Sequence, residues 1–338
     1  MTRSATWLLT AGALLFAAVL VSHGLGPVFA ALAAAGWGLT LVAAFHVLPL
    51  LLDAAAICVL FDAVLARGSW RDALLARWAG ESANSLMPVG QVAGPVVMVR
   101  SLSHRGMPMQ DAVAAITVST TLQGLAQIIF ALVGVVLLAA QAGLPVHGAH
   151  SRHTVGTSLL VGGILLVVPV TLFYLVQRRG LFARSMRAIA RFSGKRDWSQ
   201  LTSRAEAIDL AVEKMYGEGG RTLASFALSL AGWLVGTGEV YLILKLIGSP
   251  VGWADALLLE SLGQAIRGAA FAVPGALGVQ EGGYLLLAPF VGLEPDTALA
   301  LSLAKRAREI LLGLPGLLYL YFSERGWRRR VTCATAGE

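Results

Sequence analysis

Six long apolar runs constrain the fold of this chain more than any other feature. A helix that crosses a bilayer needs about 20 mostly apolar residues. The runs that reach this length are Trp7 to Leu25, Leu39 to Phe61, Ala112 to Ala140, Val155 to Val176, Thr222 to Ile247 and Thr297 to Phe322. Hydrophobic residues make up 57% of the sequence and charged residues only 13%, against roughly 25% charged in soluble domains. The sequence therefore predicts an all-α, polytopic membrane protein with six transmembrane helices and excludes a soluble globular enzyme.

Two further apolar stretches, Asp72 to Ser103 and Asp255 to Val291, are interrupted near the middle by proline and glycine. The interruptions are Pro88-Val-Gly90 and the stretch Pro274-Gly-Ala-Leu-Gly278. Each arm is shorter than a bilayer crossing requires. We therefore expect two re-entrant hairpins, each of which returns to the side from which it enters.

Basic residues indicate the orientation, because short loops rich in Lys and Arg remain in the cytoplasm. With six spans and two hairpins, most of the 26 Lys and Arg residues fall on one side, and Arg152 is the one that falls in an outside loop. Both termini are therefore predicted to be cytoplasmic. The excess of Arg over Lys suggests a GC-rich bacterial genome, and hence a bacterial inner membrane. A cleaved signal peptide ending at Val28-Phe-Ala30 is the alternative interpretation of the first run.

The two halves of the chain resemble each other when one is shifted by 186 residues. This shift aligns Asp53 with Glu239 and Pro88 with Pro274, and the two halves then begin on opposite sides of the membrane. Inverted repeats with paired broken segments are typical of transporters with a substrate site near the bilayer midplane. The predicted organisation is one membrane domain, 1–338, with a first repeat (39–140, hairpin 72–103), a cytoplasmic amphipathic segment (180–221) and a second repeat (222–323, hairpin 255–291).

The segment 180–221 mixes basic residues with aromatic and aliphatic ones. This composition favours a position along the inner membrane surface, where anionic headgroups attract basic side chains. An ordinary solvated linker is the alternative.

Charged and amide side chains inside the apolar segments concentrate around the hairpins. A charge at the centre of a membrane helix costs about 2.5 to 3.5 kcal/mol on insertion scales, so such residues usually pair or face water. We expect them to form a polar seam between the repeats. The candidate substrate-binding residues are Glu81, Asn84, Gln91, Arg100, Glu260, Gln264, Arg267, Glu281 and Arg306, and the candidate proton-coupling residues are Asp53 and Glu239.

The pairing of these charges and the faces on which they lie are open to further interpretation. Glu81 with Arg100, and Glu281 with Arg306, are alternatively ion pairs that serve folding alone. In the last run Arg308 and Glu309 are neighbours and do not share one helical face, so we expect only one of them to point into the seam.

Signals of catalysis or metal binding are weak. The residues His147, His150 and His153 form a regular pattern but lack an acidic partner, so no metal site is predicted. We find neither a nucleotide-binding loop nor a nucleophile elbow. The sequence therefore predicts no cofactor, no nucleic-acid partner and no enzymatic activity.

Three stretches resemble the flippase-like family typified by the transmembrane region of lysylphosphatidylglycerol synthase. They are Glu81 to Gly94, the pair Val99-Arg100 leading to Gly106, and Val273 to Glu281 followed by Arg306. The resemblance covers roughly residues 5 to 325 and extends in particular to membrane proteins associated with hopanoid biosynthesis. The resemblance implies that the protein moves lipids. Its implied partners are membrane lipids and lipid-biosynthesis enzymes. The polar positions that match the family are Glu81, Asn84, Arg100, Glu281 and Arg306.

Three hypotheses follow. The first is a lipid flippase or transporter, acting on a hopanoid or phospholipid. The second is a membrane enzyme acting on a polyprenyl-phosphate lipid, because undecaprenyl-pyrophosphate phosphatases also use Glu-bearing hairpins with a Pro-Gly turn. Here, however, Ala276, Leu277 and Gly278 follow that turn, and none of them supplies a nucleophile or a phosphate ligand. The third is a non-transporting accessory protein of lipid biosynthesis.

Overall fold

In the computed structural model, the chain is described over residues 33, 36–64, 69–87, 93–141, 172, 174, 175, 177, 180–192, 199–270 and 273–335. Within these residues every regular element is a helix and no strand occurs. The predicted run Trp7 to Leu25, almost all of the run Val155 to Val176, and the break at Pro88 lie outside the described residues. The predicted all-α class is confirmed for the part of the chain that the structure describes.

Three helices of the described part are long and apolar enough to cross a membrane. They are α3 (Gly38–Val64), α6 (Met109–Gln141) and α10 (Gly219–Leu246), and each coincides with a predicted run. The run Thr297 to Phe322 lies within α13 (Pro295–Thr335), a continuous helix of 41 residues whose charged residues interrupt its apolar character. The chain is therefore a multi-pass membrane protein.

Two pairs of shorter helices accompany the long ones. The first helix pair is α4 (Trp70–Leu86) with α5 (Ala93–His104), and the second helix pair is α11 (Trp253–Ala269) with α12 (Val279–Leu287). These helices contain 17, 12, 17 and 9 residues, and at 1.5 Å per residue the longest is about 26 Å. Each of these helices is therefore shorter than the hydrocarbon core of a bilayer, which is about 30 Å thick.

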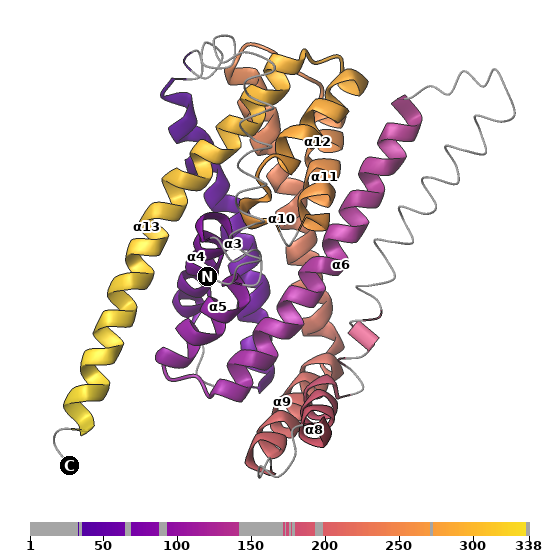
Figure 1. The fold of residues 1–338 in the computed structure, drawn as a ribbon. Coiled ribbons are helices and arrows are strands. Elements are labelled where there is room, and N and C mark those ends of the chain that lie inside the picture. The colour runs from indigo at the N-terminus through magenta and orange to yellow at the C-terminus, as the bar shows by residue number, and fades with distance from the viewer. Residues whose placement is uncertain are drawn as a thin grey trace, which may run out of the picture.

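The helices that follow the two pairs run in opposite directions. In Figure 1, α6 runs from the end of the bundle that carries α8 (Leu181–Phe192) and α9 (Ser199–Gly217) towards the other end, and α13 runs back. The starts of α5 and α12, and likewise those of α6 and α13, are separated by the same 186 residues as the aligned sequence positions. Between α12 and α13 lies the short 3-10 helix η3 (Ala288–Val291).

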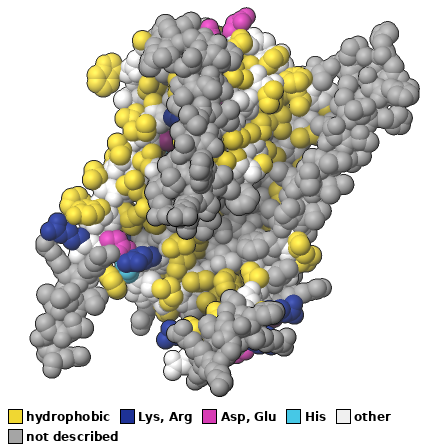
Figure 2. Space-filling model, in the orientation of Figure 1, with side chains coloured by type: hydrophobic (Ala, Val, Ile, Leu, Met, Phe, Trp, Pro, Cys, Tyr) yellow, Lys and Arg dark blue, Asp and Glu magenta, His cyan; other side chains and the backbone are white. Residues whose placement is uncertain are grey.

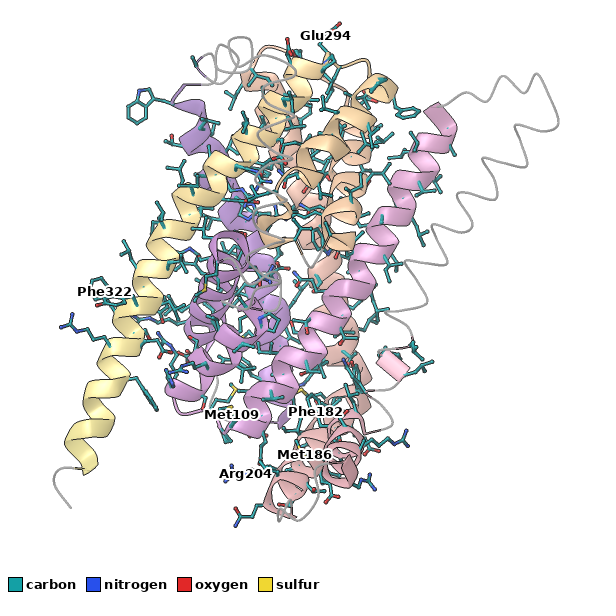
Figure 3. All side chains as sticks on the ribbon, in the orientation of Figure 1. Met109, Phe182, Met186, Arg204, Glu294 and Phe322 are labelled. Atoms are coloured by element: carbon teal, nitrogen blue, oxygen red, sulfur yellow. The ribbon has the colours of Figure 1, made fainter. Side chains whose placement is uncertain are left out.

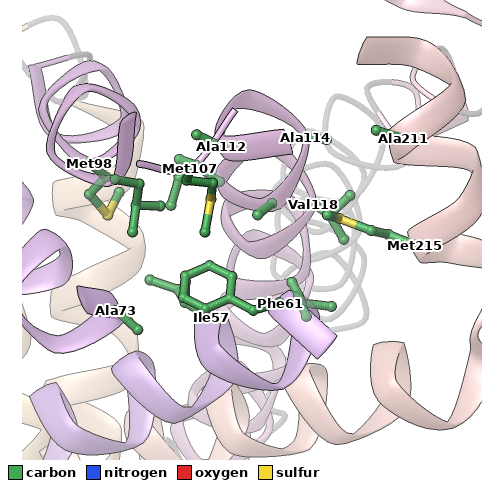
Figure 4. Packing of buried hydrophobic residues seen from close by; sticks show 14 of the residues in the cluster. Ile57, Phe61, Ala73, Met98, Met107, Ala112, Ala114, Val118, Ala211 and Met215 are labelled. Carbon is green, nitrogen blue, oxygen red and sulfur yellow. The ribbon is translucent and has the colours of Figure 1, made fainter. Parts of the chain in front are cut away.

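Apolar packing holds each half of the bundle. One buried cluster joins α3, α5, α6 and α9 through side chains that include Phe61, Met98 and Met215 (Figure 4). A second cluster joins α10, α11 and α12 through side chains that include Leu244 and Tyr284. Between helices that lie in a bilayer, close van der Waals packing of such side chains, and not their removal from water, favours association. The two halves also meet directly, since α3 and α10 make the most extensive helix-helix contact among the described elements.

The segment 180–221 is helical over most of its described length. α8 and α9 pack against each other and α9 packs against α6, with Val212 and Met215 fully buried. Figure 3 places Phe182, Met186 and Arg204 at the end where α6 begins at Met109, and Glu294 at the opposite end. One face of α9 is therefore part of the apolar core.

The outward faces of the long helices are apolar. On α13 the exposed residues Leu311, Leu314, Leu318 and Phe322 recur every three or four positions, which places them along one helical face. Figure 2 shows hydrophobic side chains over much of the described visible surface, with charged side chains at its top, in a group on its left edge and around its lower part. A lipid environment requires this distribution, because hydrocarbon does not solvate charges.

Candidate functional site

A polar cavity of about 320 Å³ lies between the two helix pairs and the central helices, within the size range of small-molecule sites. Its walls come from both halves of the chain. The ionisable and amide side chains that line it are His46, Asp53, Arg77, Glu81, Asn84, Gln123, Gln127, Glu239, Glu260, Gln264, Arg267, Arg308 and Glu309.

His46 of α3 connects the first helix pair with α10. Its Nδ1 lies 2.6 Å from Oε2 of Glu239, and its Nε2 lies 2.8 Å from Oε1 of Glu81. Arg308 of α13 completes this group, because its Nε donates to Oε1 of Glu239 at 3.1 Å and its Nη1 lies 3.6 Å from Oε1 of Glu81. Four helices are thus joined by one set of charge-assisted contacts, which are stronger than neutral hydrogen bonds.

A second polar group lies one to two turns further along α3. Arg77 of α4 donates through Nη2 to Oδ2 of Asp53 at 2.5 Å, and Gln123 of α6 donates through Nε2 to the same oxygen at 2.9 Å. Asp53 and Arg77 are both largely buried. This group ties the first helix pair to α3 and α6 across one wall of the cavity.

The charged residues of α11, in the second helix pair, form ion pairs with residues of α13. Lys305 lies with its Nζ 2.5 Å from Oε2 of Glu260, whose other oxygen accepts a hydrogen bond from Gln264 at 2.8 Å. Arg267 forms an ion pair with Glu309. The buried cations therefore each have a carboxylate partner, as burial of a charge requires.

The turn of the second helix pair is held by Glu281 and Arg306. The carboxylate of Glu281 accepts the backbone N–H of Gly278 at 2.7 Å, which caps α12, and accepts Nε of Arg306 at 2.7 Å. Arg306 also donates through Nη1 to the carbonyl of Gly275 at 3.0 Å. Gly275 and Gly278 have φ of 60° and 76°, a region that favours glycine. This ion pair therefore fixes the Pro-Gly turn η2 (Pro274–Ala276) and the start of α12.

The structure brings most of the predicted site residues together. Those of them that line the cavity are Asp53, Glu81, Asn84, Glu239, Glu260, Gln264 and Arg267. Glu281 of α12 and Arg306 of α13 bind each other beside the turn η2 and are not among the cavity-lining residues that the structure describes. Asn84 accepts the backbone N–H of Gly94 at 2.6 Å and so joins the arms of the first helix pair. Gln91 lies outside the described residues.

Arg100 is placed away from the cavity. Its side chain is 48% exposed, and it binds the carboxylate of Glu324 on α13 at 2.6 Å. The alternative of an ion pair between Glu81 and Arg100 is not what the structure shows, because Glu81 contacts His46. The physical reason is helical register, since Arg100 lies near the end of α5, four residues before His104, which is itself 3.4 Å from Glu324.

The expectation for Arg308 and Glu309 is wrong, because both line the cavity. Neighbouring residues on a helix point about 100° apart, and α13 contacts both α4 and α12 around the cavity. Arg308 turns towards α3 and α10, whereas Glu309 turns towards Arg267 of α11. A wide cavity thus receives both side chains.

Sequence reasoning missed His46 and Arg77. The available signal for His46 was a histidine in the middle of an apolar run, and for Arg77 an arginine within a stretch assigned to a hairpin. Neither signal shows a partner, because the contacting carboxylates come from distant segments.

A smaller polar group lies at the end of the bundle where α4 begins. Asp72 accepts Nη1 of Arg105 at 2.7 Å, and Arg105 donates to the hydroxyl of Tyr319 at 2.6 Å. Partial burial by itself would raise the pKa of Asp72, but hydrogen bonds from Ser69 and Arg105 outweigh it and hold that pKa below its ordinary value. This group attaches the start of the first helix pair to α13.

The charges around the cavity do not balance if His46 is neutral. Among the described residues of these contacts, the carboxylates are Asp53, Glu81, Glu239, Glu260, Glu281 and Glu309, and the permanently basic residues are Arg77, Arg267, Lys305, Arg306 and Arg308. Carboxylates therefore exceed basic groups by one. In the described residues no group of His, Cys, Asp or Glu has the arrangement of a metal site, and the pattern His147, His150 and His153 lies outside them.

Comparison with known proteins identifies the family. A family profile described as the lysylphosphatidylglycerol synthase TM region matches residues 6–316. No curated protein and no solved structure matches the chain. Because the profile covers nearly the whole sequence, the chain belongs to the lysylphosphatidylglycerol synthase transmembrane region family.

Proposed function

We propose that this protein is a lipid flippase or lipid transporter of a bacterial inner membrane. The observation that carries the proposal is the polar cavity of about 320 Å³ inside a bundle whose outward faces are apolar. A lipid needs both surfaces, because its headgroup needs hydrogen-bonding partners while its chains remain in hydrocarbon. The family is one of lipid-handling membrane proteins by its description, which supports the same class of substrate.

The proposed mechanism is alternating exposure of the cavity to the two sides of the membrane. In this proposal the two helix pairs are re-entrant hairpins that enter from opposite faces, and the two halves are inverted repeats. The opposite directions of α6 and α13 and the shared 186-residue spacing of helix starts support it. Rocking of one repeat against the other around a fixed site is the usual mechanism of such folds.

The headgroup contacts are proposed to come from residues of both halves. Glu81 and Asn84 lie on the wall formed by the first helix pair, and Gln264 and Arg267 on the wall formed by the second. Glu260 lies beside Gln264, which donates to it. Such a mixed set of donors and acceptors suits a phospholipid headgroup, and a hopanoid with a polar head is the second candidate.

The proposed activity is transport and not catalysis. Both termini are proposed to lie in the cytoplasm. The residues near the turn support this, because Gly275 and Ala276 border the cavity and offer no nucleophile. The helices α8 and α9 are the proposed contact surface for enzymes of lipid biosynthesis. Phosphate release from a polyprenyl pyrophosphate by the purified protein would contradict the non-enzymatic assignment.

The test is lipid movement in proteoliposomes made from phosphatidylethanolamine and phosphatidylglycerol. Purified protein should move fluorescently labelled phosphatidylglycerol between leaflets, measured by dithionite quenching, and a labelled hopanoid provides the second arm. Gln264→Leu should slow the movement roughly tenfold, the effect of losing about 1.4 kcal/mol of hydrogen bonding. Gln200→Leu is the matched control, because Gln200 is exposed on α9. Equal rates with and without protein, for both lipids, would refute the proposal.

A further inference from the structure

We infer that His46, Glu81 and Glu239 form a proton-binding site in the wall of the cavity, and that its proton is exchanged during lipid movement. The first part of this inference stands on geometry alone. The second part rests on the proposed transport function, which the experiments below test separately.

The two contacts of His46 require two hydrogens. Each of its ring nitrogens faces a glutamate oxygen, at 2.6 Å for Glu239 and 2.8 Å for Glu81. A carboxylate only accepts hydrogen bonds, and a neutral imidazole carries one N–H. A neutral ring between two carboxylates would place a nitrogen lone pair against an oxygen lone pair. The three residues therefore hold one proton more than a neutral histidine and two carboxylates contain.

Two cations of α13 face this site. Lys305 lies with its Nζ 3.9 Å from Oε1 of Glu239, but its shorter contact is with Glu260. Arg308 approaches His46 itself, and it does not remove the requirement. Its Nη1 lies 3.3 Å from Nε2 of His46, a longer contact than the one between Nε2 and Glu81. Its stronger contacts go to Glu239, at 3.1 Å from both Nε and Nη2. If Nε2 accepted from Arg308, the contact with Glu81 would still need a hydrogen, and Glu81 itself would then carry the proton.

The charge balance around the cavity also requires one additional proton. The carboxylates around the cavity exceed the permanently basic groups by one, so a single additional proton makes the cluster neutral. Net charge is costly in a low-dielectric interior. Asp53, the other acidic group on α3 near His46, is already bound by Arg77, which leaves the His46 site as the place for this proton.

The position of the site couples its proton to helix movement. His46 lies on α3, Glu81 on the first helix pair and Glu239 on α10, so the proton joins an element of each half of the chain. All three residues also line the cavity. Loss of the proton would turn one attractive contact of His46 into a repulsive one and so favour separation of α3 from α4 or from α10. Proton release is thereby linked to a change in the shape of the cavity.

The proton site is tested without transport, by nuclear magnetic resonance of the full chain in nanodiscs of phosphatidylethanolamine and phosphatidylglycerol. The protein is labelled with ¹⁵N-histidine and ¹³C-glutamate, and His46→Gln and Glu81→Gln assign the signals. At neutral pH we expect either an imidazolium pattern at His46 or a neutral ring with a protonated Glu81 or Glu239. A neutral ring with both carboxylates ionised would overturn the site. The wild-type spectra decide this even where one variant fails to fold.

Coupling is tested in the proteoliposomes by imposing a pH gradient. A gradient of one unit should shift the leaflet distribution of labelled phosphatidylglycerol by up to about tenfold if one proton accompanies one lipid, because one pH unit corresponds to about 1.4 kcal/mol. His46→Gln should abolish the response, and His104→Gln, a histidine outside the cavity, should retain it. Movement that ignores the gradient would overturn coupling, whereas no movement at all would reject the transport function and leave the spectra to decide the proton site.

Discussion

Arg306 holds the Glu281 carboxylate and the Gly275 carbonyl at the same time, at 2.7 and 3.0 Å. The same carboxylate caps α12 by accepting the N–H of Gly278. This pair, for which the sequence left both substrate binding and folding open, performs a structural task in this chain, since it fixes a turn that contains two glycines with positive φ. The cavity depends on this turn, because Gly275 and Ala276 form part of its wall.

Replacing Glu281 should therefore reduce stability. Glu281→Ala removes the fully buried carboxylate that binds the largely buried Arg306 and leaves that guanidinium facing a low-dielectric interior, a change that costs about 3 to 5 kcal/mol. We expect a lower melting temperature in detergent and a smaller yield of folded protein. Transport per folded molecule should fall less than the yield does; a fully stable but inactive variant would instead assign Glu281 to substrate binding.

The Lys305 and Glu260 pair should show strong coupling. Lys305→Met leaves Glu260 buried without its cation and should destabilise the fold by about 3 to 5 kcal/mol. Adding Glu260→Gln removes the leftover charge, so the double variant should recover most of that loss. Thermal melts of both single variants and the double variant measure the interaction, and additive losses would contradict it.

Arg100 should matter little to transport. It is 48% exposed and pairs with Glu324 away from the cavity, and exposed ion pairs contribute about 0 to 1 kcal/mol. Arg100→Gln should therefore keep labelled-lipid movement near the wild-type rate, with a small drop in melting temperature. A loss of movement comparable to that of Gln264→Leu would show that the family resemblance identified Arg100 correctly and that the contact with Glu324 is not decisive.

Asp72 should make stability depend on pH. Because its pKa is lowered in the folded state, it stabilises the fold above the ordinary aspartate pKa of about 4, and this contribution disappears as pH falls through the lowered value. Asp72→Asn should thus melt below wild type at neutral pH, with the difference shrinking at acidic pH. Melting curves of both proteins between neutral and acidic pH check the sign; a difference that grows on acidification would contradict it.

Much of the fold follows from local sequence patterns. Apolar runs of sufficient length predicted α3, α6 and α10, because a membrane helix satisfies its own backbone hydrogen bonds and needs only an apolar surface. The Pro-Gly interruption at 274–278 similarly predicted the turn η2, because proline and glycine disfavour helix continuation. These features depend on residues that are close in sequence, so a single sequence is enough to predict them.

For the site, the sequence could predict which residues are buried charges but not which of them contact one another. Charges in apolar segments had to pair, and this indicated that Glu81, Glu239 and Glu260 would be buried together. Which side chains meet depends on the rotation of each helix and on contacts between distant segments: His46 and Glu239 are 193 residues apart in sequence. For the same reason Arg100 turned outwards and Arg77 inwards.

The sequence by itself thus determined that the protein lies in a membrane, where its long helices are and which charged residues fall within apolar segments. All three follow from composition and local periodicity. The tertiary structure alone decided which carboxylate each cation binds, which residues face the cavity and where the cluster needs a proton. Those outcomes depend on distances of a few ångströms between helices, and Coulomb and hydrogen-bond energies change strongly over that range.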